Sequence, residues 1–280
     1  DLGIANAAGL SGARQIDLIA QIVASNAATI GNVAALQALS NKITGNGRIL
    51  DLADSVPGAT APTAADYLAA GVAGVTDANL VAVNTRIAAS TASALTNLSD
   101  INAIAATGIS AHAASLANLE AFDGTSSAPT LANYIDAGVV GVTADNLAAV
   151  NARLASAAPG AATTPSQLQA IAVAGAAAQA KAFVNLLNFK TDPSNPAPTV
   201  SSLSDLGVVG VTTPSGLDAV KGLLANINVS ASDSSAPIAD QITTAVLPTR
   251  TETPGLVWLL IFNPLATGAR PLTVGVVLLT

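Results

Sequence analysis

The residue types that most often carry enzymatic chemistry are scarce in this chain of 280 residues, which has one histidine and no cysteine. His112 would have to serve as the base of any Ser-His-Asp arrangement, yet a second, aligned stretch has Gln179 in its place. A single imidazole without thiolates is also too little for a zinc site. We therefore expect His112 to be a solvated polar position on a helix, and the protein not to be an enzyme.

The carboxylates are expected to serve helix ends rather than acid–base chemistry. Asp66, Asp77, Asp145 and Asp205 stand near predicted helix termini, where free backbone N–H groups favour an anion. The polar stretches TDPSNP (191–196) and SDSS (232–235) lack the ligand order of an EF-hand loop and the nonapeptides of a calcium-binding β-roll. We predict no catalytic, cofactor-binding or metal site, with structural calcium at these loops as a minor alternative.

The four aspartates named above lie in or beside the copies of a sequence motif, called the phrase below, that occurs three times. It reads APTAADYLAAGVAGVTDANLVAVN from Ala61, APTLANYIDAGVVGVTADNLAAVN from Ala128, and APTVSSLSDLGVVGVTTPSGLDAV from Ala197. The prolines are separated by 129 − 62 = 67 and 198 − 129 = 69 residues. The sequence thus predicts tandem repeats of about 68 residues, a pattern typical of proteins that span or bind.

Each phrase predicts a helix-turn-helix. Thr63 and Thr130 are placed as N-caps, with Asp66 completing a capping box. A glycine ends the first helix in each copy (Gly71, Gly138 and Gly207). The next threonine is placed to cap the second helix (Thr76, Thr143 and, before Pro214, Thr213). The second helix is expected to bury one stripe, made of Leu80, Val83 and Ile87 or of Leu147, Val150 and Leu154.

A longer helix follows the first two phrases. DINAIAATGISAHAASLANLEAF and LQAIAVAGAAAQAKAFVNLLNF align without gaps at an offset of 67, which places Gly108 on Gly175. These glycines predict a kink or a close helix crossing. Two further pairs recur. Tyr67 with Tyr134 is interpreted as core, and Asn84 with Asn151 is expected to hydrogen-bond between helices or to the next unit's loop, or to form a polar ladder for a partner.

The end of the chain breaks this pattern. Two apolar runs of strand length, LVWLLIF (256–262) and LTVGVVLL (272–279), flank a Pro/Gly-rich turn and predict a β-hairpin. A membrane-spanning helix would need about 20 uninterrupted apolar residues, and the interruption at 263–271 argues against membrane insertion. The hairpin would be marginal alone, so we expect it to pair with neighbouring copies or a following domain, or to cover the helices as a lid. The residues assigned to self-association are Leu256, Val257, Trp258, Leu259, Leu260, Ile261, Phe262, Leu272, Val274, Val276, Val277 and Leu278.

The expected fold class is therefore mainly α, with tandem helical repeats of a helix-turn-helix plus a longer helix and a C-terminal β-hairpin. We divide the chain into a divergent N-terminal helical unit or cap (1–60), two helical repeats (61–127 and 128–196), a truncated third repeat (197–249) and the apolar hairpin (250–280). The start at Asp1, without a methionine, favours a processed form or a segment of a longer protein.

Charge and redox composition restrict the partners. Lys and Arg number 10 against 17 Asp and Glu, for a net charge of −7, and the basic residues are scattered. A nucleic-acid partner is therefore not expected, because no basic stripe exists for a phosphate backbone. The absence of cysteine fits a bacterial protein that folds outside the cell without disulfides.

The phrase DYxxAGVxGVTxxNLxAVN, present from Asp66 to Asn84 and with Asn133 in place of the aspartate from Asn133 to Asn151, resembles helical repeats of very large secreted and cell-surface proteins of bacteria, described as adhesin-like or biofilm-associated. This resemblance implies an extracellular, multi-copy, non-enzymatic protein. The first hypothesis is a structural repeat protein that self-associates, as a homo-oligomer or filament, into a surface fibre, sheath or adhesin stalk. The alternative is an adhesion module that binds a glycan or protein through the loops at 123–129 and 191–198.

Overall fold

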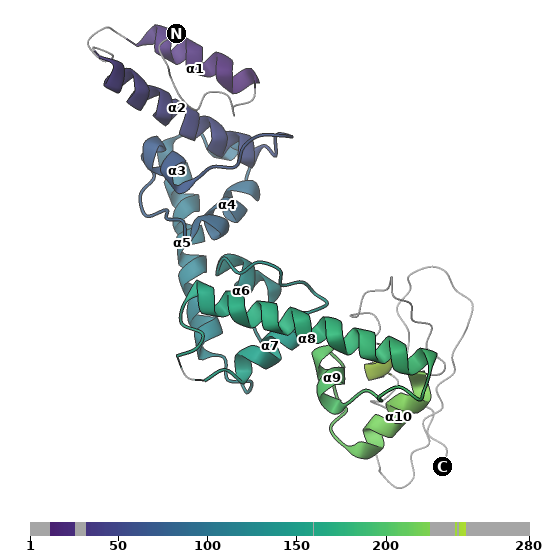
Figure 1. The fold of residues 1–280 in the computed structure, drawn as a ribbon. Helices are drawn as coiled ribbons and strands as arrows, with labels where there is room; N and C mark the ends of the chain where they lie inside the picture. Colours follow the sequence, from purple (N-terminus) through teal and green to yellow (C-terminus); the bar gives the residue numbers. More distant parts are fainter. Residues whose placement is uncertain (1–11, 26–31, 159, 225–238, 240, 245–280) are drawn as a thin grey trace, which may run out of the picture. The chain divides into compact units, whose positions relative to one another are not determined.

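The computed structural model describes residues 12–25, 32–158, 160–224, 239 and 241–244. These residues are mainly helical and contain no strand, which confirms the predicted all-α character of this part of the chain. The predicted C-terminal hairpin at 250–280 lies outside the described residues. The elements, drawn in Figure 1, are α1 (Gly12–Ala24), α2 (Val33–Ala53), α3 (Ala64–Ala70), α4 (Leu80–Ala88), the 3₁₀ turn η2 (Ala92–Ala94), α5 (Leu98–Ala121), α6 (Leu131–Asp136), α7 (Leu147–Ala155), α8 (Pro165–Thr191), α9 (Val200–Asp205) and α10 (Pro214–Leu224).

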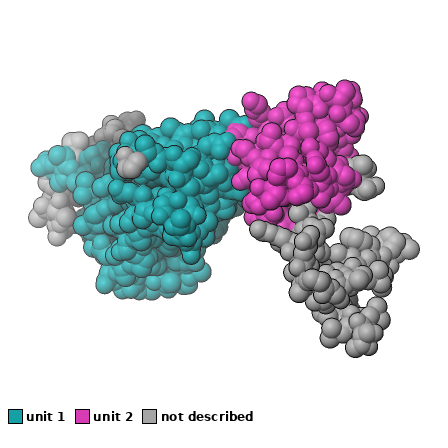
Figure 2. Space-filling view, turned by 90° about the horizontal axis from the view of Figure 1, so that it is seen from below, with its two compact units in different colours: residues 1–177 teal, residues 178–280 magenta. Residues whose placement is uncertain are grey.

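The chain forms two compact units, residues 1–177 and 178–280, which Figure 2 colours separately. The division falls within α8. Among the described residues, the first unit contains two large hydrophobic cores and a small cluster around Ile43, and the second unit contains one core.

The first core lies among α2, α3, α4 and the start of α5 (Figure 1). It buries one residue or more from each, namely Ile49, Ala53, Tyr67, Ala70, Val72, Val83, Ile87, Leu95, Ile101 and Ala105. Val83 and Ile87 are fully buried and Leu80 packs against them, so the predicted stripe of the second short helix is confirmed.

The second core combines the end of α5 with α6, α7 and the start of α8. Its buried members are Leu119, Tyr134, Ala137, Val139, Val150, Leu154, Ala162, Leu168 and Ala172. α5 therefore supplies its first half to one core and its second half to the next. Because the two halves of α5 lie in different cores, each core needs helices from other parts of the sequence to cover the half that it contains.

The third core belongs to the second unit. It contains Ala182, Leu186, Leu203, Leu206, Val208, Val211, Val220, Leu224, Ala239 and Ile242. Residues 239 and 241–244 are helical.

Local sequence explains where the short helices begin and end. Capping boxes formed by Thr63 with Asp66 and by Thr130 with Asn133 start α3 and α6. This confirms the predicted box of Thr63 with Asp66 and the predicted N-cap at Thr130; the box with Asn133 is an addition. The backbone then turns at Gly71, Gly138 and Gly207, whose φ angles of 91°, 79° and 85° lie in the left-handed region that glycine adopts without a steric penalty.

The start of the second short helix differs from the prediction that Thr76 and Thr143 cap it. α4 begins at Leu80, and the Asn79 side chain organises the turn before it: Asn79 Oδ1 accepts the Thr76 N–H at 2.9 Å, and Nδ2 donates to the Gly74 carbonyl at 2.9 Å. Asn146 makes the same two bonds, to Thr143 and Gly141. The asparagine side chain can bond to both sides of a turn because its amide has a donor nitrogen and an acceptor oxygen. A threonine hydroxyl also donates and accepts, but its side chain is shorter.

Two helix crossings explain the matched glycines. A Cβ at Gly108 would lie 2.6 Å from Val83 Cα, and a Cβ at Gly175 would lie 2.6 Å from Val150 Cα. Any side chain at these positions would overlap the backbone of α4 or α7. Of the two predicted reasons for these glycines, the close crossing is the one found.

Candidate functional site

The solitary histidine is buried, contrary to the prediction of a solvated position. His112 is 9% exposed on α5, and its Nδ1 lies 2.8 Å from the Asp136 carbonyl oxygen at the end of α6. The prediction was wrong because an isolated helix gives no information about which neighbour covers it. This contact with a backbone carbonyl fixes the orientation of the ring and gives the buried imidazole a hydrogen-bond partner.

Asp136 also links α6 to α4. Its carboxylate is buried and accepts a hydrogen bond from Arg86 Nη2 at 2.7 Å, although the two residues are 50 apart in sequence. Arg86 belongs to the first predicted repeat and Asp136 to the second, so this ion pair and the His112 contact join the two stretches. The sequence analysis missed both Arg86 and Asp136, because their pairing depends on which helices meet.

A tyrosine and an asparagine join the two short helices in the first core. Tyr67 Oη donates to Asn84 Oδ1 at 2.7 Å, and Asn84 Nδ2 donates to the Pro62 carbonyl at 3.1 Å. Burial, together with the nearby Asp66 carboxylate, raises the pKa of Tyr67 far above its ordinary value. The phenol therefore stays protonated and serves as a donor.

The same contacts recur in the second core. Tyr134 Oη donates to Asn151 Oδ1 at 2.6 Å, and Asn151 Nδ2 donates to the Pro129 carbonyl at 2.9 Å. Burial raises the pKa of Tyr134 as well. Both tyrosines are fully buried, which confirms their interpretation as core residues and confirms the hydrogen bonds predicted for Asn84 and Asn151.

The third core lacks this tyrosine and asparagine. Leu203 stands where the tyrosines stand and is fully buried. Because the third phrase has one extra residue before its second helix, Lys221 follows Val220 where the asparagines follow Val83 and Val150, and Lys221 Nζ donates to Asp218 Oδ1 at 2.9 Å. A leucine fills the position without a buried hydroxyl that would need an acceptor.

Asp66 anchors α3 to α2. Arg48 Nη1 donates to both Asp66 carboxylate oxygens, at 2.9 and 3.0 Å, while the same carboxylate accepts from the Thr63 N–H and hydroxyl. In the second core the corresponding contact is neutral: Asn133 Nδ2 donates to Ser115 Oγ at 3.4 Å. The predicted capping role of Asp66 is confirmed, and Arg48 is a partner that the sequence analysis missed.

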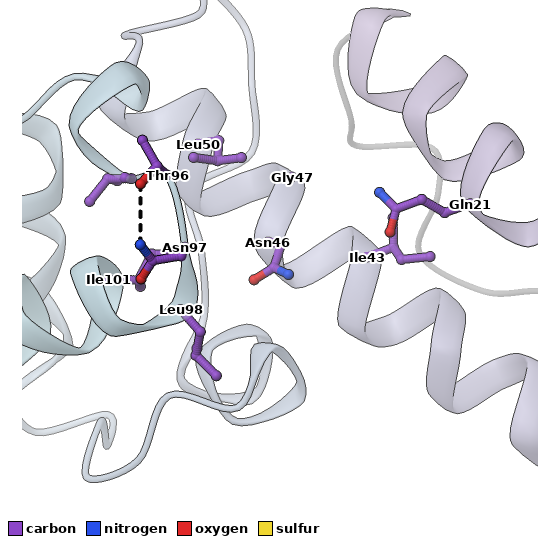
Figure 3. A pocket seen from close by; sticks show the side chains of 10 residues that line it. Gln21, Ile43, Asn46, Gly47, Leu50, Thr96, Asn97, Leu98 and Ile101 are labelled. Carbon is purple, nitrogen blue, oxygen red and sulfur yellow. Dashed lines mark hydrogen bonds between the residues drawn. The ribbon is translucent and has the colours of Figure 1, made fainter. Parts of the chain in front are cut away.

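A cavity of about 190 Å³ lies beside the first core. Its walls come from α1, from α2 and from the start of α5, and its polar members are Gln21, Asn46, Thr96 and Asn97 (Figure 3). Asn97 Nδ2 donates to Thr96 Oγ1 at 3.2 Å, whereas Asn46 Oδ1 is buried without a hydrogen-bond partner. These neutral amides and hydroxyls can hold water or a small neutral molecule, but they include neither a nucleophile with a base nor a charged group.

A second cavity, of about 230 Å³, lies where α5 and α7 end. It is lined by residues 119–123, 154, 155, 157 and 158 and by Gly160, Ala162 and Thr163. Half of this lining is alanine and glycine, and its polar side chains are those of Glu120, Asp123 and Thr163. Both cavities are smaller than the several hundred Å³ typical of drug-sized ligands.

The two loops considered for binding have internally bonded aspartates. Asp123 Oδ1 accepts from the Thr125 N–H and hydroxyl, and Asp192 Oδ1 accepts from the Ser194 N–H. These hydrogen bonds lower the pKa of both exposed carboxyls. Among the described residues, no group of three His, Cys, Asp or Glu side chains is arranged to hold a metal ion.

Two further expectations concern the apolar segments. The residues predicted for self-association, from Leu256 to Leu278, lie outside the described residues. Of the described helices, α8 alone is long and apolar enough to cross a membrane, on length and composition only. Its Leu168, Ala172, Ala182 and Leu186 are buried in the second and third cores.

The polar side chains of the described residues thus meet mainly at helix ends and at contacts between helices. The matched residue pairs could be found from the 67-residue offset, whereas the Arg86–Asp136 and Arg48–Asp66 pairs left no such signal. Comparison of the chain with protein-family models, with curated proteins and with solved structures finds no match.

Proposed function

We propose that this chain is a non-enzymatic, extracellular structural protein of tandem helical repeats, which associates with its own copies into a bacterial surface fibre, sheath or adhesin stalk. The observation that carries the proposal is the recurrence of one hydrogen-bond set, Tyr–Asn–Pro carbonyl, at residues 67 apart. Side chains that do the same packing work at a fixed period are typical of scaffolds built from stacked units.

The sharing of α5 between two cores supports this proposal. Each proposed repeat completes its core with half of a helix that its neighbour also uses. Such units are stable only in a row, because a single one leaves half of its long helix uncovered. A row extends by adding units, which suits a stalk or fibre better than a catalytic domain.

The use of the polar residues also supports the proposal. His112, Arg86 and Asp136 meet between the first two proposed repeats, and the buried tyrosines bond to asparagines on the adjacent helix. Each of these groups is already engaged by another part of the chain. The contacts therefore hold units together, and they support a role in which rigidity matters.

Electron microscopy and size-exclusion chromatography with light scattering test the self-association. We expect the 280-residue chain to form oligomers or filaments whose mass grows with concentration, and a chain that lacks residues 254–280 to be smaller. A wild-type chain that stays monomeric at every concentration would contradict the proposal. Immunolabelling of intact bacterial cells that express the protein tests the location, and labelling only after lysis would argue against a surface role.

A second candidate function is adhesion to a glycan or protein through the loops at 123–129 and 191–198. The observation in its favour is that both loops are exposed and that Asp123 and Asp192 each form the same local turn with the residues that follow. Replacing each loop by a Gly-Ser segment of equal length should abolish binding to glycan arrays or host-cell surfaces. If binding persists in the doubly replaced chain, these loops are not the binding site.

A further inference from the structure

The cavity beside the first core has buried apolar walls and a polar rim. Ile43, Leu95 and Ile101 line it and are at most 6% exposed. Gln21 of α1 and Thr96, which precedes α5, also line it, and both residues are exposed. A cavity of this composition can remove an apolar group from water and can orient a ligand through a few polar contacts.

Asn46 of α2 places an unsatisfied polar atom in this cavity. Figure 3 shows its side chain between Gln21 on one side and Asn97 and Leu98 on the other. Asn46 Oδ1 is buried and has no hydrogen-bond partner. A buried carbonyl oxygen without a donor is unfavourable, so a ligand that brings a donor to this atom would remove that cost.

Two other polar side chains of the lining already have partners within the chain. Asn97 Oδ1 accepts from the Asp100 N–H at 3.1 Å, and Asn97 Nδ2 donates to Thr96 Oγ1 at 3.2 Å. The Thr96 hydroxyl donates in turn to Asp100 Oδ2 at 2.7 Å. These bonds form the start of α5. Among Asn46, Thr96 and Asn97, it is therefore Asn46 that offers an acceptor to a ligand.

The local sequence of α2 indicates that Asn46 and Gly47 serve this cavity rather than the helix. Both stand in the interior of α2, although asparagine and glycine form helices poorly. The preceding Gly45 has a packing reason, since a Cβ there would overlap the backbone of Asp66. Asn46 and Gly47 line the cavity instead. Residues that weaken an element locally are expected where they serve a site.

The volume and charge of the cavity restrict what it can hold. Its volume is about 190 Å³, and an apolar cavity of about 150 Å³ is large enough for benzene. The described residues that line it carry no charge, so a charged ligand would be buried without a counter-ion, which is unfavourable. Water can bond to Asn46, but water against Ile43 and Ile101 lacks polar partners and is displaced at little cost.

We propose that this cavity binds a small neutral molecule that consists of one apolar ring and one O–H or N–H donor. The donor bonds to Asn46 Oδ1, and the ring lies against Ile43, Leu95 and Ile101. The site goes beyond the proposed structural role and does not depend on self-association. Phenol is the simplest probe with this chemistry.

A comparison of phenol with toluene in the wild-type chain tests the proposal. The two molecules have the same number of non-hydrogen atoms, but toluene has a methyl group in place of the hydroxyl. Titration calorimetry should show one phenol bound per chain, and the melting temperature should rise with phenol concentration. Toluene should bind about tenfold more weakly, because it leaves Asn46 Oδ1 without a donor. Benzoate, the charged probe, should leave the melting temperature unchanged.

Asn46→Leu removes the acceptor and keeps a side chain of similar shape. This variant should bind phenol and toluene equally, and its unliganded form should melt at a higher temperature because a buried unpaired oxygen is gone. Asn118→Leu is the matched control, since Asn118 is exposed on α5 and does not line the cavity. It should keep the preference of about tenfold for phenol that the wild type shows.

NMR of the backbone amides locates the bound phenol. The amide signals of Asn46 and Leu98 should shift on addition of phenol, whereas those of Ala157 and Thr163, which line the second cavity, should not. Shifts confined to Ala157 and Thr163 would place the ligand in the second cavity and overturn the proposal.

The remaining outcomes also decide against the proposal. If phenol does not bind, the cavity holds water only. If wild type binds phenol and toluene equally, or if Asn46→Leu still prefers phenol, Asn46 Oδ1 is not the acceptor. If benzoate binds as tightly as phenol, the ligand class is wrong. The ligand comparison in the wild type needs no variant to fold, and none of these results bears on self-association, which light scattering measures separately.

Discussion

The stretches 61–108 and 128–175 make the same helix-capping contacts with different charges. Asp66 of the first corresponds to Asn133 of the second, each at the third position of a capping box. Asp100 likewise corresponds to Gln167: Asp100 accepts from the Thr96 N–H at 3.0 Å and hydroxyl at 2.7 Å, and Gln167 accepts from the Thr163 N–H at 3.1 Å and hydroxyl at 3.0 Å.

This difference shows that the hydrogen-bond geometry, rather than the charge, sets where these helices start. A carboxylate and an amide oxygen can both accept from two N–H or O–H groups. The charged version adds two properties that the neutral one lacks. It attracts a cation, as Arg48 shows beside Asp66, and it titrates.

The largest expected effect is the same in both stretches, because it involves no charge. Gly108→Ala and Gly175→Ala should each lower the free energy of unfolding by about 3 kcal/mol, since the new methyl group overlaps the backbone of α4 or α7. Chemical denaturation followed by circular dichroism measures this. Gly222→Ala in α10, where a Cβ meets nothing within 4 Å, should stabilise instead by about 0.5–1 kcal/mol. Unequal losses at Gly108 and Gly175 would break the comparison.

The next effect should separate the two stretches. Asp66→Asn should cost about 2 kcal/mol, because the Arg48 side chain, 14% exposed, loses its carboxylate partner. Asn133→Asp should change stability by less than about 1 kcal/mol, since Ser115 carries no charge and a carboxylate suits a helix N-terminus. Hydrogen exchange of the α3 and α6 amides measures each change locally. Equal effects at both positions would mean that the Arg48 contact adds nothing to the cap.

The buried tyrosines provide a smaller, charge-free effect. Tyr67→Phe and Tyr134→Phe should each cost about 1 kcal/mol, because Asn84 or Asn151 loses a donor at a buried site. The double change Tyr67→Leu with Asn84→Val replaces both partners of the hydrogen bond by apolar side chains. Thermal unfolding should show it to be less destabilising than the sum of its single changes. Strict additivity would contradict the view that the two residues act as a pair.

The smallest effect is a dependence on pH at the start of α5. Hydrogen bonds from the Thr96 side chain, and from the backbone of Thr96 and Asn97, lower the pKa of Asp100 below its ordinary value of 3.8. Their contribution is therefore present above pH 3.8 and is lost as the pH falls through the lowered pKa of the folded state. Hydrogen exchange at acidic pH should show α5 fraying at its start.

The matched variants sharpen this last prediction. Asp100→Asn should remove the acid dependence at α5, and Gln167→Glu should introduce one at α8. A proton NMR titration of the Asp100 carboxyl checks the direction of the shift directly. An Asp100 pKa at or above 3.8 would contradict the assigned cause.

Sequence reasoning succeeded where the determining contacts are local. The cap at Thr63 and the left-handed turn at Gly71 depend on neighbours within a few residues, and the stripe of α4 depends on spacing along one helix. The close crossing at Gly108 was one of two predicted alternatives, because a glycine alone indicates room for a backbone but not which element uses it.

The wrong predictions have two causes: two residues compete to organise the same turn, or the contact comes from a helix that is distant in the sequence. Thr76 is a good capping residue, yet Asn79 displaces it because one amide satisfies both sides of the turn. His112 was expected in water because the aligned stretch has Gln179 in its place, whereas its Nδ1 lies 2.8 Å from a carbonyl oxygen of α6 and the side chain is buried. No spacing rule along one helix predicts a partner that a different helix provides.

The sequence by itself determined the helical character, the caps at Thr63 and Thr130 and the residues that recur at a period of 67, because hydrogen-bonded caps and apolar stripes are encoded over a few residues. Only the tertiary structure decided that α5 is divided between two cores and that Arg86 reaches Asp136 across 50 residues. These contacts depend on how helices pack in three dimensions. Their free energy comes from burying the surfaces of separate segments against each other, and the sequence of one segment does not show which other segment will cover it.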